Sequence, residues 1–302
     1  MKCINKRFVR VCSLLLVCSL CTISGTGCGE NRLEDAFEAD LPGIGIQTSE
    51  ESSKIPYFAS DLCVTDTDVQ DIEADTEDAL AACFFNLSEK KVLYAKNIHE
   101  RMYPASTTKI MTALVALDKG DLDAQTTVSK EAITFSESGV STAKLKEGDV
   151  LTLRQLLYAL LTVSANDAAN VIAEQIAGSQ DAFVEMMNQE AQKIGATNTH
   201  FVNANGLHSE DHYTTVYDLY LMFNAAMQHE EFLQMLQEKE YQASYQAADG
   251  TTVEAVWSTT NQFTKGDVTV PDGVTAVGGK TGTTTAATKT WMCLPFWTAP
   301  LP

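Results

Sequence analysis

Residues 103–114 of this 302-residue chain read YPASTTKIMTAL. Pro104 is typical of a helix start, and apolar residues then recur at helical spacing until Gly120, at Ile110, Ala113, Leu114 and Leu117. The pattern predicts a helix that begins beside Pro104 and buries one face. Ser106 and Lys109 are three residues apart and fall on the same face of that helix, so the amine can reach the hydroxyl.

Two more short motifs follow this Ser-x-x-Lys sequence. Ser164-Ala165-Asn166 begins 58 residues after Ser106, and Lys280-Thr281-Gly282 begins 116 residues after Ser164. Each motif alone is common, and an exposed Ser–Lys pair on a helix would explain the first one by itself. The ordered set, with the first motif at a helix start and the last at the end of a predicted strand, indicates a serine nucleophile activated by lysine.

The residues around the three motifs resemble the low-molecular-weight penicillin-binding proteins, which are serine-type D-alanyl-D-alanine carboxypeptidases. The similar segments are 103–112, 164–169, 201–207 and 212–218, and the resemblance runs from about Ala81 to about Ala287. It implies an α+β fold of the β-lactamase/transpeptidase-like type. In that fold an antiparallel sheet is flanked by helices and a helical subdomain is added.

The resemblance also implies three catalytic residues. Ser106 would be the nucleophile, Lys109 the base that takes its proton, and Ser164 the relay that passes a proton to the leaving D-alanine. Lys109 can act as a base only when it is neutral, so burial and the nearby cation of Lys280 must lower its pKa. At a helix start, the Ser106 N–H also lies where an oxyanion would develop.

By the same resemblance, the remaining motif residues hold the substrate. Asn166 would bind the peptide, while Lys280 and Thr281, with Gly282, would face its terminal carboxylate. The backbone N–H of Thr283 would complete the oxyanion hole. No metal ion or other cofactor is expected, because the histidines and cysteines have no metal-type spacing. His208 and His212 are expected to be polar loop residues.

Periodicity predicts the other elements. The residue types and turn signals favour two β-hairpins and one further strand, at 82–87 with 91–95, at 240–247 with 251–258, and at 274–277. Apolar spacing predicts helices at 151–161, 166–177, 182–194 and 213–227. Thr215 and Asp218 are placed as a capping box. Strands, then helices, then strands agree with an α+β fold.

The first 28 residues have the features of an export signal. Four basic residues within 2–10 precede 14 uncharged residues at 11–24. Gly27-Cys28 resembles a bacterial lipoprotein cleavage box, which makes Cys28 the candidate lipidation site; the alternative is an ordinary signal peptide. Residues 29–80 hold fifteen acidic and only two basic residues, which predicts a disordered linker. The folded domain is therefore expected at 81–287.

The overall charge excludes one class of partner. The chain has 40 acidic and 21 basic residues and a formal charge of −19, so it lacks the basic character that nucleic-acid binding requires. The expected partners are peptidoglycan stem peptides ending in D-Ala-D-Ala, β-lactams as inhibitors, and the membrane, reached through the N-terminal lipid or an uncleaved signal. The expected location is the extracytoplasmic face of a bacterial membrane, at the cell wall.

The last residues depart from the family pattern. The family continues after its Lys-Thr-Gly motif with two strands and a closing helix, whereas residues 288–302 contain two tryptophans and three prolines. We expect an aberrant tail at 288–302, produced by truncation or a frameshift. The strand that carries Lys280 would then lack its partners.

The resemblance implies an enzyme that removes the terminal D-alanine of stem peptides through an acyl-enzyme. Two alternatives stay open. A class A-like β-lactamase would need a deacylating glutamate, for which Glu210 is a poor candidate. An inactive, truncated remnant associated with peptidoglycan would agree with the unusual tail.

Overall fold

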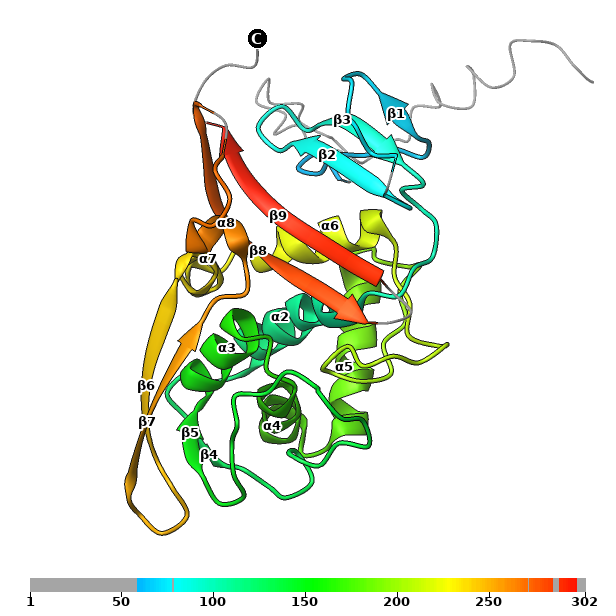
Figure 1. Ribbon diagram of the computed structural model, residues 1–302. Helices are drawn as coiled ribbons and strands as arrows, with labels where there is room; N and C mark the ends of the chain where they lie inside the picture. Colours follow the sequence, from blue (N-terminus) through cyan, green and yellow to red (C-terminus); the bar gives the residue numbers. More distant parts are fainter. Residues whose placement is uncertain (1–58, 78, 271, 285–287, 298–302) are drawn as a thin grey trace, which may run out of the picture. The chain divides into compact units, whose positions relative to one another are not determined.

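The computed structural model describes residues 59–77, 79–270, 272–284 and 288–297 (Figure 1). By its contacts the chain divides into two units, Met1–Tyr57 and Phe58–Pro302, and every described residue belongs to the second. The predicted signal at 1–28, Cys28 and the first part of the predicted linker therefore lie outside the described residues. Within the described ranges, no helix has the length and apolar character needed to cross a membrane.

A central helix organises the domain. The 3-10 turn η1, Ala105–Thr108, leads directly into α2, Lys109–Lys119, which ends before Gly120 as predicted. Residues 109–116 of α2 are all buried, not only the apolar stripe that the sequence indicated. The reason is that α2 contacts helices on several sides: α3 (Leu153–Thr162), α4 (Asn166–Ala177), α5 (Gln180–Lys193) and α6 (Val216–Ala226).

The predicted helices are present, with small differences at their ends. α3 starts two residues later than expected because residues 150–152 form strand β5, and Thr152 caps α3 in a capping box with Gln155. α6 begins after Thr215, whose side chain accepts from the Asp218 N–H at 3.0 Å. The Asp218 carboxylate accepts instead from the Asn198 N–H and the Thr199 hydroxyl, at 2.8 and 2.7 Å, so it fixes the preceding loop.

Two short helices were not predicted from the sequence. α7, Glu230–Gln237, buries Phe232, Met235 and Leu236, and α8, Gln262–Lys265, is capped by Asn261. Each is too short to give a sustained apolar period.

The described strands form three antiparallel sheets. The first has the order β1–β3–β2, with β1 Val69–Gln70, β2 Ala82–Asn86 and β3 Lys91–Lys96. The second has the order β4–β5–β6–β7, with β4 Gln125–Thr127, β5 Val150–Thr152, β6 Glu240–Gln246 and β7 Thr252–Ser258. The third pairs β8 Val274–Thr284 with β9 Thr288–Trp297. Both predicted hairpins are confirmed.

The domain starts earlier than predicted, so the disordered-linker prediction is wrong for its last part. Cys63 is completely buried, its N–H donates to the Tyr220 hydroxyl at 2.8 Å, and β1 pairs with β3. Hydrogen bonds to polar groups hold much of this segment; for example, the Lys96 ammonium donates to the carbonyl oxygens of Thr76 and Ala79. Such contacts leave no hydrophobic period in the sequence, which explains the error.

The strand that carries Lys280 also has a partner, which corrects the prediction that it would lack one. β8 and β9 pair antiparallel from Val274 opposite Trp297 to Thr284 opposite Thr288. Pro295 lies opposite Ala276, next to a register shift, where a missing N–H donor is tolerated. Residues 285–287 and 298–302 lie outside the described residues.

Candidate active site

The turn that carries Ser106 is held by its own hydroxyl groups. Ala105 has a φ of 50°, a left-handed conformation that is unusual for a residue with a side chain. The Thr107 hydroxyl donates to the Pro104 carbonyl at 2.6 Å, and the Thr108 hydroxyl donates to the Ala105 carbonyl at 2.8 Å. The two threonines between Ser106 and Lys109 therefore stabilise a turn that presents the serine at the start of α2.

Lys109 lies beside Ser106, as the sequence predicted, with Nζ 3.0 Å from Ser106 Oγ. Its side chain is completely buried. Burial holds the pKa of the Lys109 amine well below its ordinary value, the positive charge of Lys280 lowers it further, and the charge of Asp167 opposes the change. These effects together favour the neutral amine.

The other contacts of Lys109 determine how a neutral amine is oriented. Nζ also meets two oxygens that can only accept, Oδ1 of Asn166 at 2.6 Å and the backbone carbonyl of Asn205. A neutral amine has two N–H donors and one lone pair. Because the two carbonyl oxygens take both donors, the lone pair is left facing the hydroxyl of Ser106. This arrangement suits removal of the serine proton.

The second and third motifs meet in the same place. The Lys280 ammonium donates to Ser164 Oγ at 2.9 Å and to the Thr281 carbonyl at 2.7 Å. Ser164 itself has a left-handed φ of 58°, whereas Ser106 follows a left-handed residue, Ala105. Lys280 is also buried, and burial lowers the pKa of its amine to about 7. The site thus holds two buried amines whose charges oppose each other.

Two glycines allow backbone segments to approach the Ser106 turn. A Cβ on Gly282 would lie 2.9 Å from the Ser106 nitrogen, so only glycine lets β8 pass this close to η1. A Cβ on Gly206, whose φ is 84°, would lie 2.1 Å from the Ala105 carbonyl oxygen. The glycine of the third motif is therefore required by packing against the first motif.

The remaining predicted residues lie at the end of β8. The Thr281 hydroxyl is 3.1 Å from the Thr260 hydroxyl, so Thr260 adds a polar group beside the third motif that sequence reasoning missed. Thr283 is exposed and follows Gly282 in β8.

Asp167, next to Asn166, is buried and accepts from the N–H groups of Ala143 and Leu145 at 2.9 and 3.1 Å. It fixes the loop before β5 to the start of α4.

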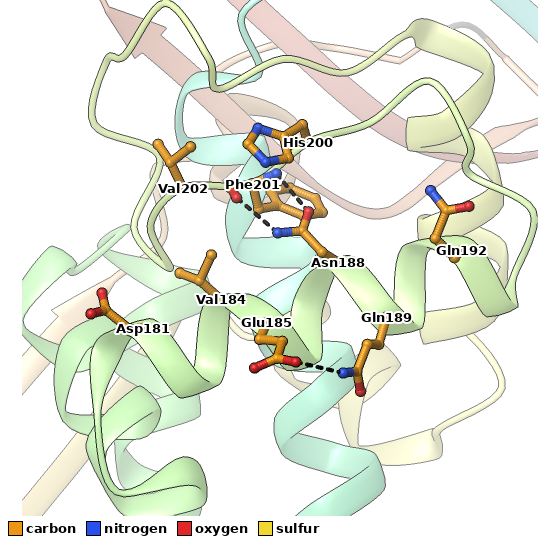
Figure 2. A pocket seen from close by; sticks show the side chains of 9 residues that line it. All are labelled: Asp181, Val184, Glu185, Asn188, Gln189, Gln192, His200, Phe201 and Val202. Carbon is orange, nitrogen blue, oxygen red and sulfur yellow. Dashed lines mark hydrogen bonds between the residues drawn. The ribbon is translucent and has the colours of Figure 1, made fainter.

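The loop that supplies the Asn205 carbonyl is held against α5. The Asn188 side chain donates to the Phe201 carbonyl at 2.9 Å and accepts from the Phe201 N–H at 2.8 Å. Figure 2 shows this pair at a surface pocket formed by α5 and residues 200–202. The Asn188 side chain thus bonds to both backbone groups of Phe201, as a paired strand would. No spacing pattern in the sequence indicates such a contact.

His212 lies in a loop, as expected. The sequence did not indicate that it is buried: it is 2% exposed and its Nε2 lies 2.8 Å from the Thr108 hydroxyl. Burial lowers its pKa to about 4, with smaller effects from His200, Lys109 and His208. His208 is exposed and contacts Tyr103 edge-on, which agrees with a loop position.

The family model for D-alanyl-D-alanine carboxypeptidase matches residues 68–294. The chain belongs to this family. The match starts before Ala81 and ends after Ala287, so the carboxypeptidase domain includes β1 and most of β9, in agreement with the corrected boundaries. Glu210, the candidate for a β-lactamase-type glutamate, is exposed.

Individual carboxypeptidases and a related solved structure agree with this assignment. The chain is 38% identical over 156 residues to D-alanyl-D-alanine carboxypeptidase DacF of Bacillus subtilis, which is 51% of this chain but only 40% of DacF. It is 37% identical over 209 residues to DacB2 of Mycobacterium tuberculosis, 68% of this chain and 67% of that protein. The crystal structure of the Streptomyces K15 DD-transpeptidase superposes with a TM-score of 0.66 at 31% identity, covering 72% of this chain and 85% of that one.

Proposed function

We propose that this protein is an exported serine-type D-alanyl-D-alanine carboxypeptidase. It removes the terminal D-alanine of peptidoglycan stem peptides through an acyl-enzyme on Ser106, and β-lactams acylate the same serine. The observation that carries the proposal is the contact of a completely buried Lys109 with Ser106 Oγ at 3.0 Å, in a chain of the carboxypeptidase family.

Acylation begins when Ser106 Oγ attacks the carbonyl carbon of the bond between the two D-alanines. The serine proton moves to the lone pair of Lys109, and the carbonyl oxygen becomes an oxyanion. When the C–N bond breaks, the proton that Lys109 took from Ser106 passes through the Ser164 hydroxyl to the leaving nitrogen, D-alanine departs, and Lys109 is neutral again. Water then attacks the ester carbonyl carbon while Lys109 takes one of its protons. The C–O bond to Ser106 breaks, Lys109 returns the proton to Ser106 Oγ, and the shortened peptide leaves with a free carboxyl group.

Two backbone donors would stabilise the oxyanion, the N–H groups of Ser106 and Thr283. The close approach that Gly282 permits supports this role, because it puts the strand leading to Thr283 against the Ser106 nitrogen. Preorganised donors of this kind contribute more than most other groups to acyl transfer.

Lys280 and Thr281 would receive the terminal carboxylate of the substrate, and Asn166 would help to hold the peptide. A pKa of about 7 leaves Lys280 only partly charged at neutral pH. An arriving carboxylate favours the charged amine, so the full positive charge develops when the substrate binds. Specificity for a free C-terminus follows from this coupling.

The first test is covalent labelling. A fluorescent penicillin should label the purified protein, and the Ser106→Ala variant should show no label and no release of D-alanine from a peptide ending in D-Ala-D-Ala. Ser138→Ala is the matched control, because Ser138 is exposed. Rapid penicillin turnover instead would indicate a β-lactamase, and no label with no D-alanine release would indicate an inactive remnant. Persistent labelling of Ser106→Ala would overturn the assignment.

Export and membrane attachment rest on the N-terminal sequence. The basic start, the uncharged run at 11–24 and Gly27-Cys28 support cleavage before Cys28 and attachment of a lipid there. In a bacterial host, labelled fatty acid should be incorporated into the wild-type protein and not into Cys28→Ser. Incorporation into that variant would contradict the assignment of Cys28.

A further inference from the structure

We infer that His212 is a positioning residue for the oxyanion hole: through Thr108 it sets the orientation of the peptide group between Ala105 and Ser106. The inference rests on the proposed function, because the N–H of that peptide group is one of the two proposed oxyanion donors. It adds to the reaction a residue 106 positions away from the nucleophile.

The hydrogen bonds around His212 allow only one arrangement of protons. The Val202 N–H donates to His212 Nδ1 at 3.2 Å, so Nδ1 has no proton and Nε2 carries it. The Thr108 hydroxyl uses its single proton toward the Ala105 carbonyl, so it must accept from Nε2. A directed chain therefore runs from Val202 through His212 and Thr108 to Ala105.

The end of this chain is the peptide group that precedes the nucleophile. In a trans peptide the carbonyl and the N–H point in opposite directions, and the described residues contain no cis peptide bond. A hydrogen bond that fixes the Ala105 carbonyl therefore also fixes the direction of the Ser106 N–H. The left-handed φ of Ala105 makes such a constraint necessary, since this conformation is unfavourable in isolation.

The peptide group between Ala105 and Ser106 is closely packed, so it cannot move to another partner when the hydrogen bond from Thr108 is lost. Gly206 lies against the Ala105 carbonyl and Gly282 against the Ser106 nitrogen, each at a distance that excludes a Cβ. His212 and Thr108 are themselves buried, at 2% and 0% exposed, so water cannot readily replace their contact. The side chain that donates to Thr108 thus controls a donor inside the site.

Two pairs of variants separate this role from simple packing. Thr108→Val keeps the shape and removes the hydroxyl, whereas Thr108→Ser keeps the hydroxyl. His212→Asn keeps an acceptor near the Nδ1 position but loses the donor to Thr108, whereas His212→Gln keeps a donor near the Nε2 position. His200→Asn is the control, because His200 is exposed and its Nδ1 contacts the Asp211 carbonyl rather than Thr108.

Thr108→Val and His212→Asn should each lower kcat for D-Ala-D-Ala peptides by about 10- to 100-fold, while KM stays within about twofold, because only the transition state carries the oxyanion. Thr108→Ser and His212→Gln should recover most of the rate. A boronic acid transition-state analogue should bind more weakly by the same factor. Combining Thr108→Val with His212→Asn should cost no more than either change alone, since both interrupt one chain.

Equal kcat for His212→Asn and His212→Gln, or additive losses in the double variant, would overturn the inference. So would a fall in the melting temperature that fully accounts for the lost activity. One measurement does not depend on turnover: the ring 15N shifts of His212 should show a proton on Nε2 and none on Nδ1, and the opposite tautomer would overturn the chain. If the wild-type protein neither binds penicillin nor releases D-alanine, the proposed function fails separately from this result.

Discussion

Lys109 and Lys280 are among the largest side chains that the folded domain buries completely. Burial disfavours the ammonium form of each, and the charge of Lys280 lowers the pKa of Lys109 further. The site therefore keeps one amine neutral for proton transfer and leaves the other ready to become charged. Lys109 therefore serves as a neutral base, whereas Lys280 provides a positive charge for the substrate carboxylate.

Replacing Lys109 by arginine tests the role of the neutral amine. Arginine keeps a positive charge but cannot lose its proton at ordinary pH, so Lys109→Arg should acylate with penicillin more slowly by several orders of magnitude. Stopped-flow acylation measures this rate. Lys193→Arg is the control, since Lys193 is exposed and pairs with Glu190. Near-normal acylation of Lys109→Arg would mean that another group removes the serine proton.

Lys280 makes the stability of the domain depend on pH. Its pKa is about 7 in the folded chain, whereas an ordinary lysine has a pKa of 10.5, so between these two pH values the unfolded chain binds one more proton than the folded chain. The free energy of unfolding should therefore rise with pH from about 7 toward 10, by up to about 1.4 kcal/mol per pH unit from this group. Below about pH 7 the amine is charged in both states and its contribution levels off.

Denaturant unfolding at pH 6.5 and pH 9 measures this effect. The difference in unfolding free energy between wild type and Lys280→Met should shift in favour of the wild type at the higher pH. Lys193→Met should show no such shift, because its ion pair with Glu190 raises the pKa of Lys193 and keeps it charged throughout. A pH-independent difference for Lys280→Met would contradict the lowered pKa.

The sequence predicted the Ser106–Lys109 contact because both residues lie on one helix face. It could not predict the Asn205 carbonyl or His212 as partners of that helix. These contacts join residues 96 and 104 positions apart, and they depend on the path of a loop rather than on a repeating pattern. The side-chain types of this loop, Asn and His, are equally common on exposed loops.

At the level of elements, α5 holds the loop that completes the site. Asn188→Ala removes both hydrogen bonds to Phe201, whose backbone groups would be left without these partners. We expect the free energy of unfolding to fall by about 1–3 kcal/mol and amide exchange at Phe201 to accelerate. Gln189→Ala, one residue along α5 and exposed, is the matched control in Figure 2 and should change stability by less than about 0.5 kcal/mol. Equal effects of the two variants would show that Asn188 does not hold the loop.

Long, amphipathic elements were the ones that periodicity identified. α4 begins and ends at the predicted residues because an apolar face runs its whole length and Gly178 ends it in a left-handed conformation. β4, β5 and β1 have only two or three residues each, too few for any alternation to appear. The two tryptophans and three prolines of 288–302 argue against a strand there, but β9 pairs with β8, and its Pro295 lies beside a register shift where the pairing is not interrupted.

For the whole domain, the corrected N-terminal boundary has a measurable consequence. Compared with a chain that starts at residue 59, a chain that starts at residue 81 should have a melting temperature lower by about 5 °C or more. The longer deletion takes away β1, the buried Cys63 and its contacts with the hydroxyls of Tyr217 and Tyr220. Calorimetry of the two shortened chains makes the comparison. Equal melting temperatures would restore the boundary near Ala81.

The glycines that flank the Ser106 turn also limit how this gene can change. Every single-nucleotide missense change in a glycine codon gives a residue with a Cβ, and a Cβ at position 206 or 282 would lie 2.1 or 2.9 Å from backbone atoms of the turn. No neighbouring side chain can be altered to make room, because the obstructing atoms belong to the main chain. Mutations that change the activity of the enzyme can therefore accumulate at the side chains that line the site, but not at Gly206 or Gly282.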